Sequence, residues 1–317
     1  RPSDPPIPTN ASRIASGPFR SRRSTNRVSA PSEHRSVHCT NATTLAFSPD
    51  SDAKACGPRW TNAFIRWTER RCMRYIRFRD PAGSVRRGRL EEDTVRFGDD
   101  SYELDAVDVL PPCEPSKIVC VGLNYADHAA ERDSELPERP LLFFKTPNTA
   151  AAHGSTVRLP EGKERVDWEA ELAVVIGEQC RNVETDEAMD VVEGYTCLND
   201  ISNRDDQDEE QNWVRGKAFD NAAPMGPVVA TPDEVPDDAS IELRVDGETK
   251  QSSSIDQFIF SVPELIAEIT THLTLEPGDV ISTGTPAGVG PLSDGDHVAV
   301  EIEGIGTLEH DVQAASR

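Results

Sequence analysis

Apolar and polar residues alternate over short stretches through most of this chain, which predicts a protein built mainly from short β-strands. The alternation begins at Arg74–Arg79 and continues through 84–91 and 94–97, with turn signals such as Asp80-Pro81 between the stretches. Further strands are predicted at 105–110, 117–122, 141–145, 194–200, 226–230, 241–245 and 248–251. Short strands separated by glycine are expected again from Asp279 to His310.

Few stretches carry a helical pattern. A short helix is expected within 124–131, a second one near 185–192, and an amphipathic helix over 262–273 with Pro263 near its start. No apolar run approaches the length of a membrane span, so we expect a soluble cytoplasmic protein that does not enter the membrane. The pattern as a whole predicts a fold of many short strands with few helices.

Residues 1–72 lack this alternation and differ in charge from the remainder. They hold 12 basic and 5 acidic residues, a net charge of +7, whereas residues 73–317 carry a net charge of −30. Their Ser, Arg, Pro and Asn content predicts disorder. Because the first methionine is Met73, we also entertain the hypothesis that 1–72 is translated upstream sequence. The rival interpretation is a basic tail that binds an acidic partner.

The acidic part of the chain divides in turn. Residues 73–112 predict a small β-rich N-terminal subdomain, which ends at the break Pro111-Pro112. Residues 113–317 predict a larger unit that begins with the strand 117–122. Every motif with chemical potential falls within this larger unit.

The overall charge excludes one large class of function. With 56 acidic and 33 basic residues, the formal net charge is −23, and nucleic-acid binding requires clustered basic side chains instead. An acidic surface poor in lysine is typical of halophile-like proteins in a high-salt cytoplasm, and full stability at low salt would contradict that hypothesis. The seven cysteines form no CxxC motif, so Cys113, Cys120, Cys180 and Cys197 are expected to be buried, reduced thiols.

Two carboxylates two residues apart, Glu169 and Glu171, lie at the start of an apolar, β-branched run that ends at Gly177. Residues i and i+2 of a strand point to the same face, so both carboxylates are expected to aim at one spot. Buried like charges that close need a cation or a proton between them. Asp200, which closes another apolar strand, would complete an all-oxygen ligand set that favours Mg²⁺ or Mn²⁺, with Ca²⁺ as an alternative, over zinc. Alone, the Glu-x-Glu pair is a weak signal, because exposed edge strands often carry such pairs.

Four stretches in order resemble the fumarylacetoacetate hydrolase family, in particular its smaller acylpyruvase-like and 2-hydroxyhepta-2,4-diene-1,7-dioate isomerase-like members. The stretches are Val121–His128, Asp167–Gly177, Gly194–Asp205 and Pro277–Gly290. The resemblance covers residues 113–317 and implies a β-rich α+β fold, a mixed β-roll of the fumarylacetoacetase C-terminal-domain type with few short helices. It also implies a homodimer. The pattern of short strands is compatible with this fold but does not single it out.

The resemblance implies a role for individual residues. Glu169, Glu171 and Asp200 match the divalent-metal ligands of the family, and His128 matches its catalytic histidine with Glu131 as the paired acid. Lys217 matches a lysine that faces the substrate and can stabilise an oxyanion or enolate. Substrate contacts are expected from four further residues: Tyr125, Arg204, Gln207 and Thr285.

The implied activity is that of a metal-dependent enzyme acting on a 2-oxo or 2-hydroxy-dienoic acid. Hydrolysis of a C–C bond in an acylpyruvate-type substrate is the first expectation. The same groups could serve as an isomerase of a hydroxy-dienedioate or as an oxo-acid decarboxylase of aromatic catabolism. A binding protein for a metal or an oxo acid, without catalysis, is the alternative from a different class.

Overall fold

The computed structural model of the protein describes residues 73–131 and 136–315, so the predictions for residues 1–72 lie outside the described residues. The strands are β1 (Arg74–Arg79), β2 (Val85–Glu91), β3 (Thr94–Phe97), β4 (Asp100–Glu103), β5 (Asp108–Val109), β6 (Ile118–Gly122), β7 (Leu141–Lys145), β8 (Ala150–Ala151), β9 (Ser155–Arg158), β10 (Val166–Trp168), β11 (Ala170–Ile176), β12 (Val192–Asn199), β13 (Ser202–Asn203), β14 (Ala223–Ala230), β15 (Ser240–Val245), β16 (Glu248–Ser254), β17 (Val280–Ser282), β18 (Gly290–Pro291), β19 (His297–Ile302) and β20 (Gly306–Gln313).

The helices are short. The α-helices are α1 (Ala126–Glu131), α2 (Arg204–Glu209), α3 (Val214–Lys217) and α4 (Val262–His272), and the 3₁₀ turns are η1 (Leu104–Ala106), η2 (Pro147–Thr149), η3 (Ala188–Val191), η4 (Pro232–Glu234) and η5 (Ile255–Gln257). The described chain is therefore mostly β-sheet with few helices, as the alternating pattern predicts.

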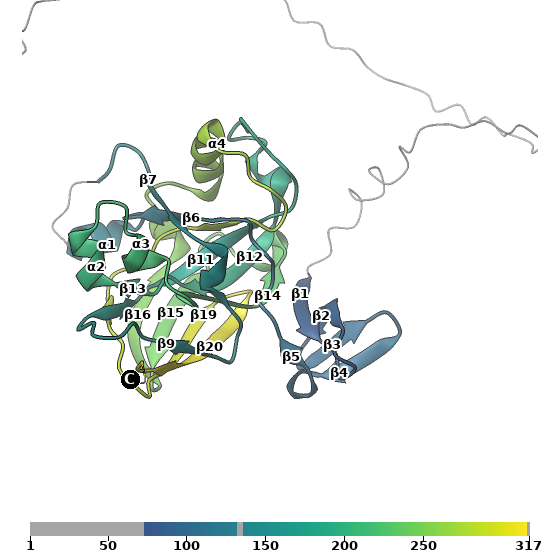
Figure 1. The fold of residues 1–317 in the computed structure, drawn as a ribbon. Coiled ribbons are helices and arrows are strands. Elements are labelled where there is room, and N and C mark those ends of the chain that lie inside the picture. Colours follow the sequence, from purple (N-terminus) through teal and green to yellow (C-terminus); the bar gives the residue numbers. More distant parts are fainter. Residues whose placement is uncertain (1–72, 132–135, 316–317) are drawn as a thin grey trace, which may run out of the picture. The chain divides into compact units, whose positions relative to one another are not determined.

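A twelve-stranded sheet forms the larger part of the fold (Figure 1). Its strands follow the order β4-β3-β2-β1-β14-β12-β11-β17-β6-β7, with β5 paired to β1 and β8 to β14. The strands of the predicted N-terminal subdomain join this sheet where Arg74 of β1 pairs with Ala230 of β14. The division of the chain near residue 112 stays a prediction.

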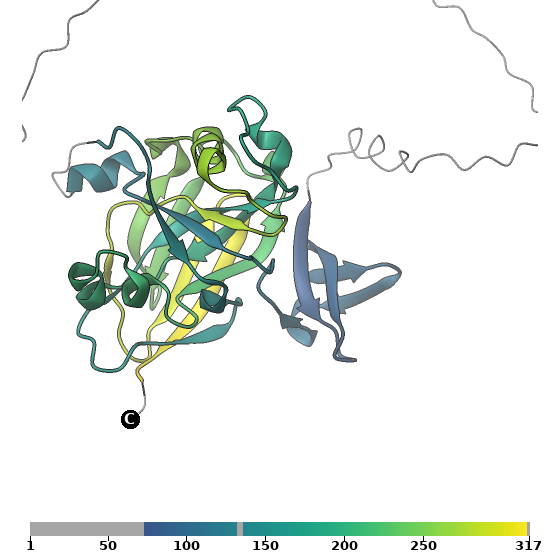
Figure 2. The ribbon, with the colours of Figure 1, turned by 45° about the horizontal axis from the view of Figure 1, so that its top comes forward.

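A five-stranded sheet, in the order β16-β15-β19-β20-β9, packs against β11, β12 and β14 of the larger sheet (Figure 2). The apolar side chains of the two sheets form the main core, to which β11 contributes Leu172, Val174 and Ile176. The alternate residues of β11, Ala173 and Val175, belong to a second apolar cluster. Because side chains alternate along a strand, Glu171 lies on the same side of β11 as this second cluster.

Most predicted elements are confirmed, including the amphipathic helix, which spans Val262–His272 with Pro263 in its first turn. The predicted helix near 185–192 is wrong: a 3₁₀ turn covers Ala188–Val191, and β12 begins at Val192. The reason is strand pairing, since the β-branched Val192 pairs with Ile176 of β11.

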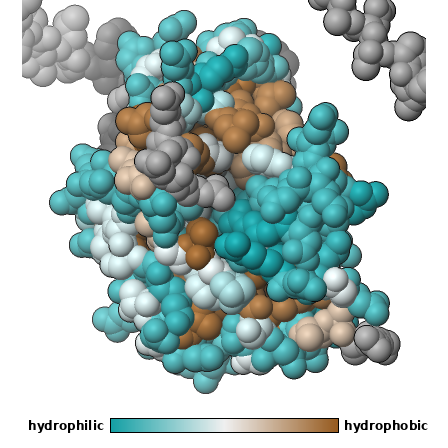
Figure 3. All heavy atoms as spheres, turned by 90° about the vertical axis from the view of Figure 1, so that its left-hand side faces the viewer, coloured by the Kyte–Doolittle hydropathy of each residue, from teal (hydrophilic) through white to brown (hydrophobic). Residues whose placement is uncertain are grey.

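Figure 3 shows the face on the left of Figure 1, where hydrophobic surface lies among hydrophilic areas. Exposed apolar side chains of the described residues include Leu141 and Phe144 on the edge strand β7 and Val214 on α3. No helix in the described part of the chain has the length and apolar character to span a bilayer. Cys113, Cys120, Cys180 and Cys197 are buried and unpaired, as predicted.

Candidate active site

Three buried carboxylates converge where β11 and β12 lie side by side. One oxygen from each of Glu169, Glu171 and Asp200 lies within 4.8 Å of the others, and the residues are 7%, 2% and 0% exposed. The Asp200 backbone N–H donates to the Glu169 carbonyl at 2.8 Å, which extends the β11–β12 ladder by one step. The structure therefore brings together the three residues predicted as metal ligands.

The geometry around Glu169 differs from the sequence-based expectation of a single strand. β10 ends at Trp168 and β11 begins at Ala170, and the two strands belong to different sheets. Two buried side-chain amides accept hydrogen bonds from the backbone at this break: Asn199 Oδ1 from Glu169 N at 2.8 Å, and Gln251 Oε1 from Ala170 N at 2.9 Å. The predicted convergence of Glu169 and Glu171 thus depends on side chains from other strands.

Lys217 and Arg204 surround the carboxylates with positive charge. The Lys217 ammonium donates to Glu169 Oε2 at 2.7 Å and to Asp200 Oδ2 at 2.8 Å. Arg204 donates through Nη2 to Glu169 Oε1 at 2.5 Å, through Nε to Asp167 at 2.8 Å and through Nη1 to Gln207 Oε1 at 2.7 Å. In this structure Arg204 therefore binds both Gln207 and the acidic cluster. The predicted contact of Arg204 and Gln207 with substrate stays a prediction.

Lys145 is a third cation that the sequence reasoning missed. Its fully buried ammonium donates to the carbonyl oxygens of Ile201 at 2.9 Å, Lys217 at 2.7 Å and Ala222 at 2.8 Å. These bonds use all three ammonium hydrogens, so the 2.8 Å contact with Asp200 Oδ1 is an ion pair without a hydrogen bond. A lysine that ends the apolar stretch Leu141–Lys145 is the signal that could have revealed it.

The three carboxylates differ in how much neighbouring positive charge balances their negative charge. Burial alone would raise the pKa of Glu169, but Lys217 and Arg204 hold that pKa far below its usual range. Burial, followed by the charges of Asp200 and Glu169, raises the pKa of Glu171 well above its ordinary value. Glu171 is thus the carboxylate whose negative charge most needs a further cation.

The donor set fits a hard divalent cation. All three groups offer oxygen, which Mg²⁺, Mn²⁺ and Ca²⁺ prefer. Asp200 Oδ1 is buried and receives no hydrogen bond, so it retains lone pairs that a metal ion could use. The residues present therefore fit the metal predicted from the sequence, without distinguishing one ion from another.

His128 and Glu131 form a pair on α1. The His128 ring Nδ1 lies 3.1 Å from Glu131 Oε2, and the His128 side chain is nearly buried. A carboxylate at Nδ1 favours the tautomer that carries its proton there, which leaves a lone pair on Nε2. The Gly288 backbone N–H faces both Glu131 oxygens at 3.3 and 3.4 Å, so the pair touches the glycine-rich loop 283–290.

The same loop also contacts the carboxylate cluster. The Gly284 N–H donates to Glu171 Oε2 at 2.8 Å, and the Ser282 hydroxyl donates to the same oxygen at 2.5 Å. Gly284 has a φ of +97°, and a Cβ there would lie 2.9 Å from the Asn124 Cβ, so only glycine suits this position. The loop therefore links the cluster to the His128–Glu131 pair.

Tyr125 and Thr285 flank this region. The Tyr125 ring is fully buried against Phe258, with ring centroids 4.9 Å apart, and its hydroxyl has no hydrogen-bond partner among the described residues. Burial, and then the charge of Glu171, raises the Tyr125 pKa well above its ordinary value. Thr285 is 5% exposed and accepts a hydrogen bond from Gln251 at 2.9 Å. Their predicted role in substrate binding stays a prediction.

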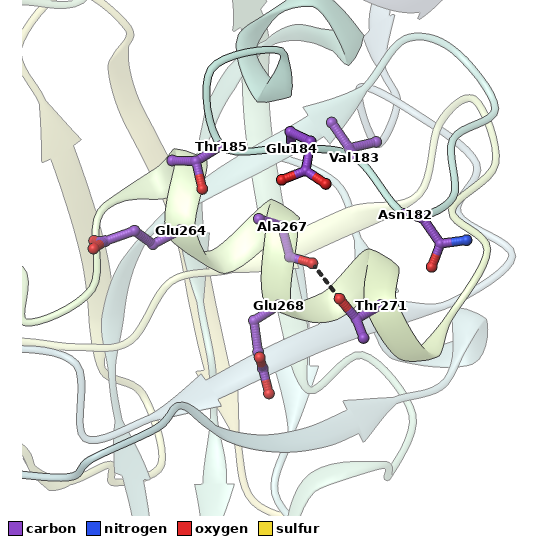
Figure 4. A pocket seen from close by; sticks show the side chains of 8 residues that line it. All are labelled: Asn182, Val183, Glu184, Thr185, Glu264, Ala267, Glu268 and Thr271. Atoms are coloured by element: carbon purple, nitrogen blue, oxygen red, sulfur yellow. Dashed lines mark hydrogen bonds between the residues drawn. The ribbon is translucent and has the colours of Figure 1, made fainter. Parts of the chain in front are cut away.

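A surface depression beside α4, shown in Figure 4, is separate from this site. Its lining residues are Asn182, Val183, Glu184, Thr185, Glu264, Ala267, Glu268 and Thr271. Two of its carboxylates already have partners, since Glu264 caps α4 through Ser261 and Glu268 accepts from Arg139 at 2.8 Å. None of the predicted site residues lines it.

Comparison with known proteins gives relatives for most of the described chain. The family model described as fumarylacetoacetate (FAA) hydrolase, C-terminal, matches residues 117–313. An uncharacterized protein of Archaeoglobus fulgidus is 47% identical over 230 residues, which are 72% of this chain and 92% of that protein.

Two further relatives carry names that describe a reaction. An oxaloacetate tautomerase of Bacillus subtilis is 42% identical over 230 residues, covering 68% of this chain and 76% of that protein. The crystal structure of a 2-hydroxyhepta-2,4-diene-1,7-dioate isomerase from Mycobacterium marinum superposes with a TM-score of 0.71 at 36% identity, covering 77% of this chain and all of that one.

Proposed function

Because the chain belongs to the fumarylacetoacetate hydrolase family, we propose that it is a divalent-metal-dependent enzyme that interconverts the enol and keto forms of a 2-oxo acid. Oxaloacetate is the first substrate to test, since one relative is an oxaloacetate tautomerase. The convergence of Glu169, Glu171 and Asp200 within 4.8 Å carries the proposal.

These three carboxylates would hold the metal ion. When bound there, Mg²⁺ or Mn²⁺ supplies Lewis-acid polarisation of the 2-oxo group, which makes the neighbouring carbon more acidic. Lys217, whose ammonium already lies against Glu169 and Asp200, places a positive charge beside the oxygen that becomes negative in the enolate. Burial of this charge in the site strengthens its effect.

His128 moves the proton. Glu131 holds Nδ1, so Nε2 is the atom that accepts a proton from the carbon next to the carbonyl or returns one to it. Tautomerisation shifts one proton between carbon and oxygen and breaks no C–C bond, so it requires neither water nor a leaving group. Thr285 and the backbone N–H groups of loop 283–290 would bind a substrate carboxylate, with Tyr125, Arg204 and Gln207 around it.

The test follows the ultraviolet absorbance of enol-oxaloacetate as it converts to the keto form. The protein is expected to accelerate the decay, EDTA to abolish the acceleration, and added Mg²⁺ or Mn²⁺ to restore it. The same samples receive an acylpyruvate, whose cleavage is followed separately. Decay of enol-oxaloacetate at the buffer rate with metal bound, together with acylpyruvate cleavage, would refute the tautomerase and support the hydrolase.

Hydrolysis of an acylpyruvate C–C bond is the second candidate, favoured by the His128–Glu131 pair. A histidine with a carboxylate at Nδ1 can take a proton from water as readily as from carbon. His128→Ala is expected to lower the rate of the reaction that uses this base by about 10²- to 10⁴-fold. The rates of His128→Ala and of the wild type are measured with both substrates. Glu92→Ala, which changes an exposed acidic residue in a turn, serves as the control variant. An unchanged rate in His128→Ala would remove the histidine from the mechanism.

The homodimer stays a proposal as well. The apolar residues Leu141, Phe144 and Val214 are 49%, 47% and 60% exposed, and such surface is common where subunits meet. Sedimentation of the purified chain measures the state directly.

A further inference from the structure

Gln251, on β16, connects the metal-binding strand to the glycine-rich loop. Its side chain is 1% exposed and belongs to the five-stranded sheet rather than to the sheet that carries the carboxylates. Gln251 Oε1 accepts from Ala170 N at 2.9 Å, while Nε2 donates to Thr285 Oγ1 and to the Pro286 carbonyl, each at 2.9 Å. Ala170 is the residue between Glu169 and Glu171, so one amide side chain touches both halves of the site.

The orientation of this amide follows from its two backbone partners. A backbone N–H can only donate, so the oxygen of Gln251 must face Ala170. A proline carbonyl can only accept, so the nitrogen must face Pro286. In the reverse orientation, the Gln251 amide N–H would face the Ala170 N–H, donor against donor. The Gln251 oxygen would then face the Pro286 carbonyl oxygen, acceptor against acceptor.

This orientation fixes the role of the Thr285 hydroxyl. The amide nitrogen of Gln251 has no lone pair, so Thr285 Oγ1 must accept from it and cannot donate back. Within residues 73–131 and 136–315, no acceptor takes the hydroxyl hydrogen of Thr285. The hydrogen is therefore free to donate to an anionic oxygen in the site.

The loop has little freedom to escape this arrangement. A Cβ at Gly288 would lie 2.3 Å from the carbonyl oxygen of Lys250, the residue before Gln251. The backbone of the loop therefore lies directly on β16, and its contacts to Glu171 and Glu131 are made from that position.

We propose that Gln251 is a positioning residue that turns the Thr285 hydroxyl into a hydrogen-bond donor for the substrate carboxylate and holds the loop in register with the metal ligands. The proposal rests on the proposed function, because it assumes that a 2-oxo acid binds beside loop 283–290. It adds a residue on a separate sheet whose neutral amide acts through Thr285 and not on the substrate itself.

Gln251→Glu tests the proposal, because a carboxylate can still accept from Ala170 N but takes the Thr285 hydrogen instead of donating to Oγ1. We expect KM for enol-oxaloacetate to rise about tenfold or more, since a lost hydrogen bond to a charged group has that magnitude. The value of kcat should change much less. The matched control is Gln313→Glu, the same change at an exposed position of β20 in the same sheet, which should leave both constants unchanged.

Thr285→Val removes the hydroxyl and keeps the shape of the side chain. It should raise KM to a similar extent, and in its background Gln251→Glu should raise KM no further. An unchanged KM in Thr285→Val would overturn the proposal, as would an equal effect of Gln251→Glu in both backgrounds. If Gln251→Glu fails to fold, Gln251→Leu is used in the same comparison of single and double variants, because it removes the donor without burying a charge.

A second readout separates this proposal from the proposed function. Binding of oxalate, an unreactive dicarboxylate, to the Mn²⁺-loaded variants is measured by titration calorimetry. Weaker oxalate binding in Gln251→Glu and Thr285→Val, non-additive in the double variant, supports the positioning role even if the wild type converts no oxaloacetate. Equal oxalate affinity in all variants contradicts that role even if the wild type is an active tautomerase.

Discussion

Asp279 and the Glu169–Glu171–Asp200 cluster are both buried acids beside neighbouring strands of one sheet, yet their oxygens have different surroundings. Asp279, just before β17, accepts from the backbone N–H groups of Ser116, Lys117 and Glu276 at 2.9, 3.1 and 2.8 Å. The Ser116 hydroxyl at 2.7 Å and the Lys117 ammonium complete its shell. Burial alone would raise the Asp279 pKa, but these donors lower it below its usual range.

In the cluster, Glu169 has donors on both oxygens, from Arg204 and Lys217, but the other two carboxylates do not. Glu171 receives two hydrogen bonds, both on Oε2, and faces two other carboxylates, while Asp200 Oδ1 receives none. A buried acid whose oxygens are all covered by donors fixes a loop, whereas buried acids that face one another retain capacity for a cation. The incomplete donor shells of Glu171 and Asp200, more than burial or acidity, distinguish the candidate metal site from the structural carboxylate Asp279.

Glu171→Gln gives the largest expected effect. The amide keeps the shape and can still accept from Gly284 N, but it removes one anionic ligand and the repulsion between carboxylates. Metal affinity should fall by more than about 100-fold, since even residues that only support a ligand cost 10- to 100-fold. Calorimetric titration with Mn²⁺ measures the affinity. In EDTA, without metal, the variant should unfold at the same temperature as the wild type or at a higher one. A lower unfolding temperature would contradict the inference that the three carboxylates repel one another.

Asp279→Asn is the matched change in the other environment and should give the reverse outcome. The amide nitrogen would face the donors of Lys117 and Glu276, so the variant loses the ion pair and part of the hydrogen-bond shell. The free energy of unfolding should fall by about 2–3 kcal/mol, at the lower end for a broken buried pair because Lys117 is partly exposed. Denaturant titration measures it. A change in Mn²⁺ affinity beyond about threefold would show that the two regions are coupled.

The sequence could predict the residue types of the cluster but not the shell that separates it from Asp279. The apolar, β-branched run that ends at Gly177 correctly predicts β11, and the Glu-x-Glu pattern with Asp200 correctly predicts three carboxylates close together. The break at Glu169 was not predicted, because it depends on which sheet each half joins. Strand partners are set by contacts between distant parts of the chain, which local periodicity does not contain.

Three buried polar residues of the site escape prediction for the same reason, because their contacts join distant parts of the chain. Lys145, Asn199 and Gln251 are each buried polar residues on a strand, a pattern that also fits the exposed face of a sheet. Gln251 lies 81 residues from the Ala170 amide that it contacts, and Lys145 lies 56 residues from the Ile201 carbonyl. For Lys145, the local signal is its place at the end of the apolar stretch Leu141–Lys145 in a region that holds few lysines.

His310 extends the comparison with Asp279 to a second buried titratable group. Its surroundings favour the neutral imidazole. Its Nε2 lies 2.9 Å from Asn199 Nδ2, which can only donate, so Nε2 must accept and carry no proton. Burial lowers the pKa of His310 to about 4 from 6.5. Asp279 is the converse case, since its donors favour the charged form and lower its pKa below 3.8.

The two groups therefore destabilise the protein in acid over different pH ranges. Between pH 6.5 and about 4, the unfolded state binds a proton at His310 that the folded state does not, so stability falls as the pH falls. That loss reaches about 3 kcal/mol at pH 4. The contribution of Asp279 is fully present above its unfolded pKa and is lost only as the pH falls through its lower folded pKa.

Denaturant titrations in EDTA at pH 7, 5.5, 4 and 3 measure the free energy of unfolding of both variants. For His310→Gln, this free energy should fall less steeply than for the wild type between pH 6.5 and 4. For Asp279→Asn, it should fall with the wild-type slope in that range and less steeply below pH 4. Wild-type slopes for His310→Gln in the upper range would mean that Asn199 accepts a charged histidine, and the contrast with Asp279 would fail.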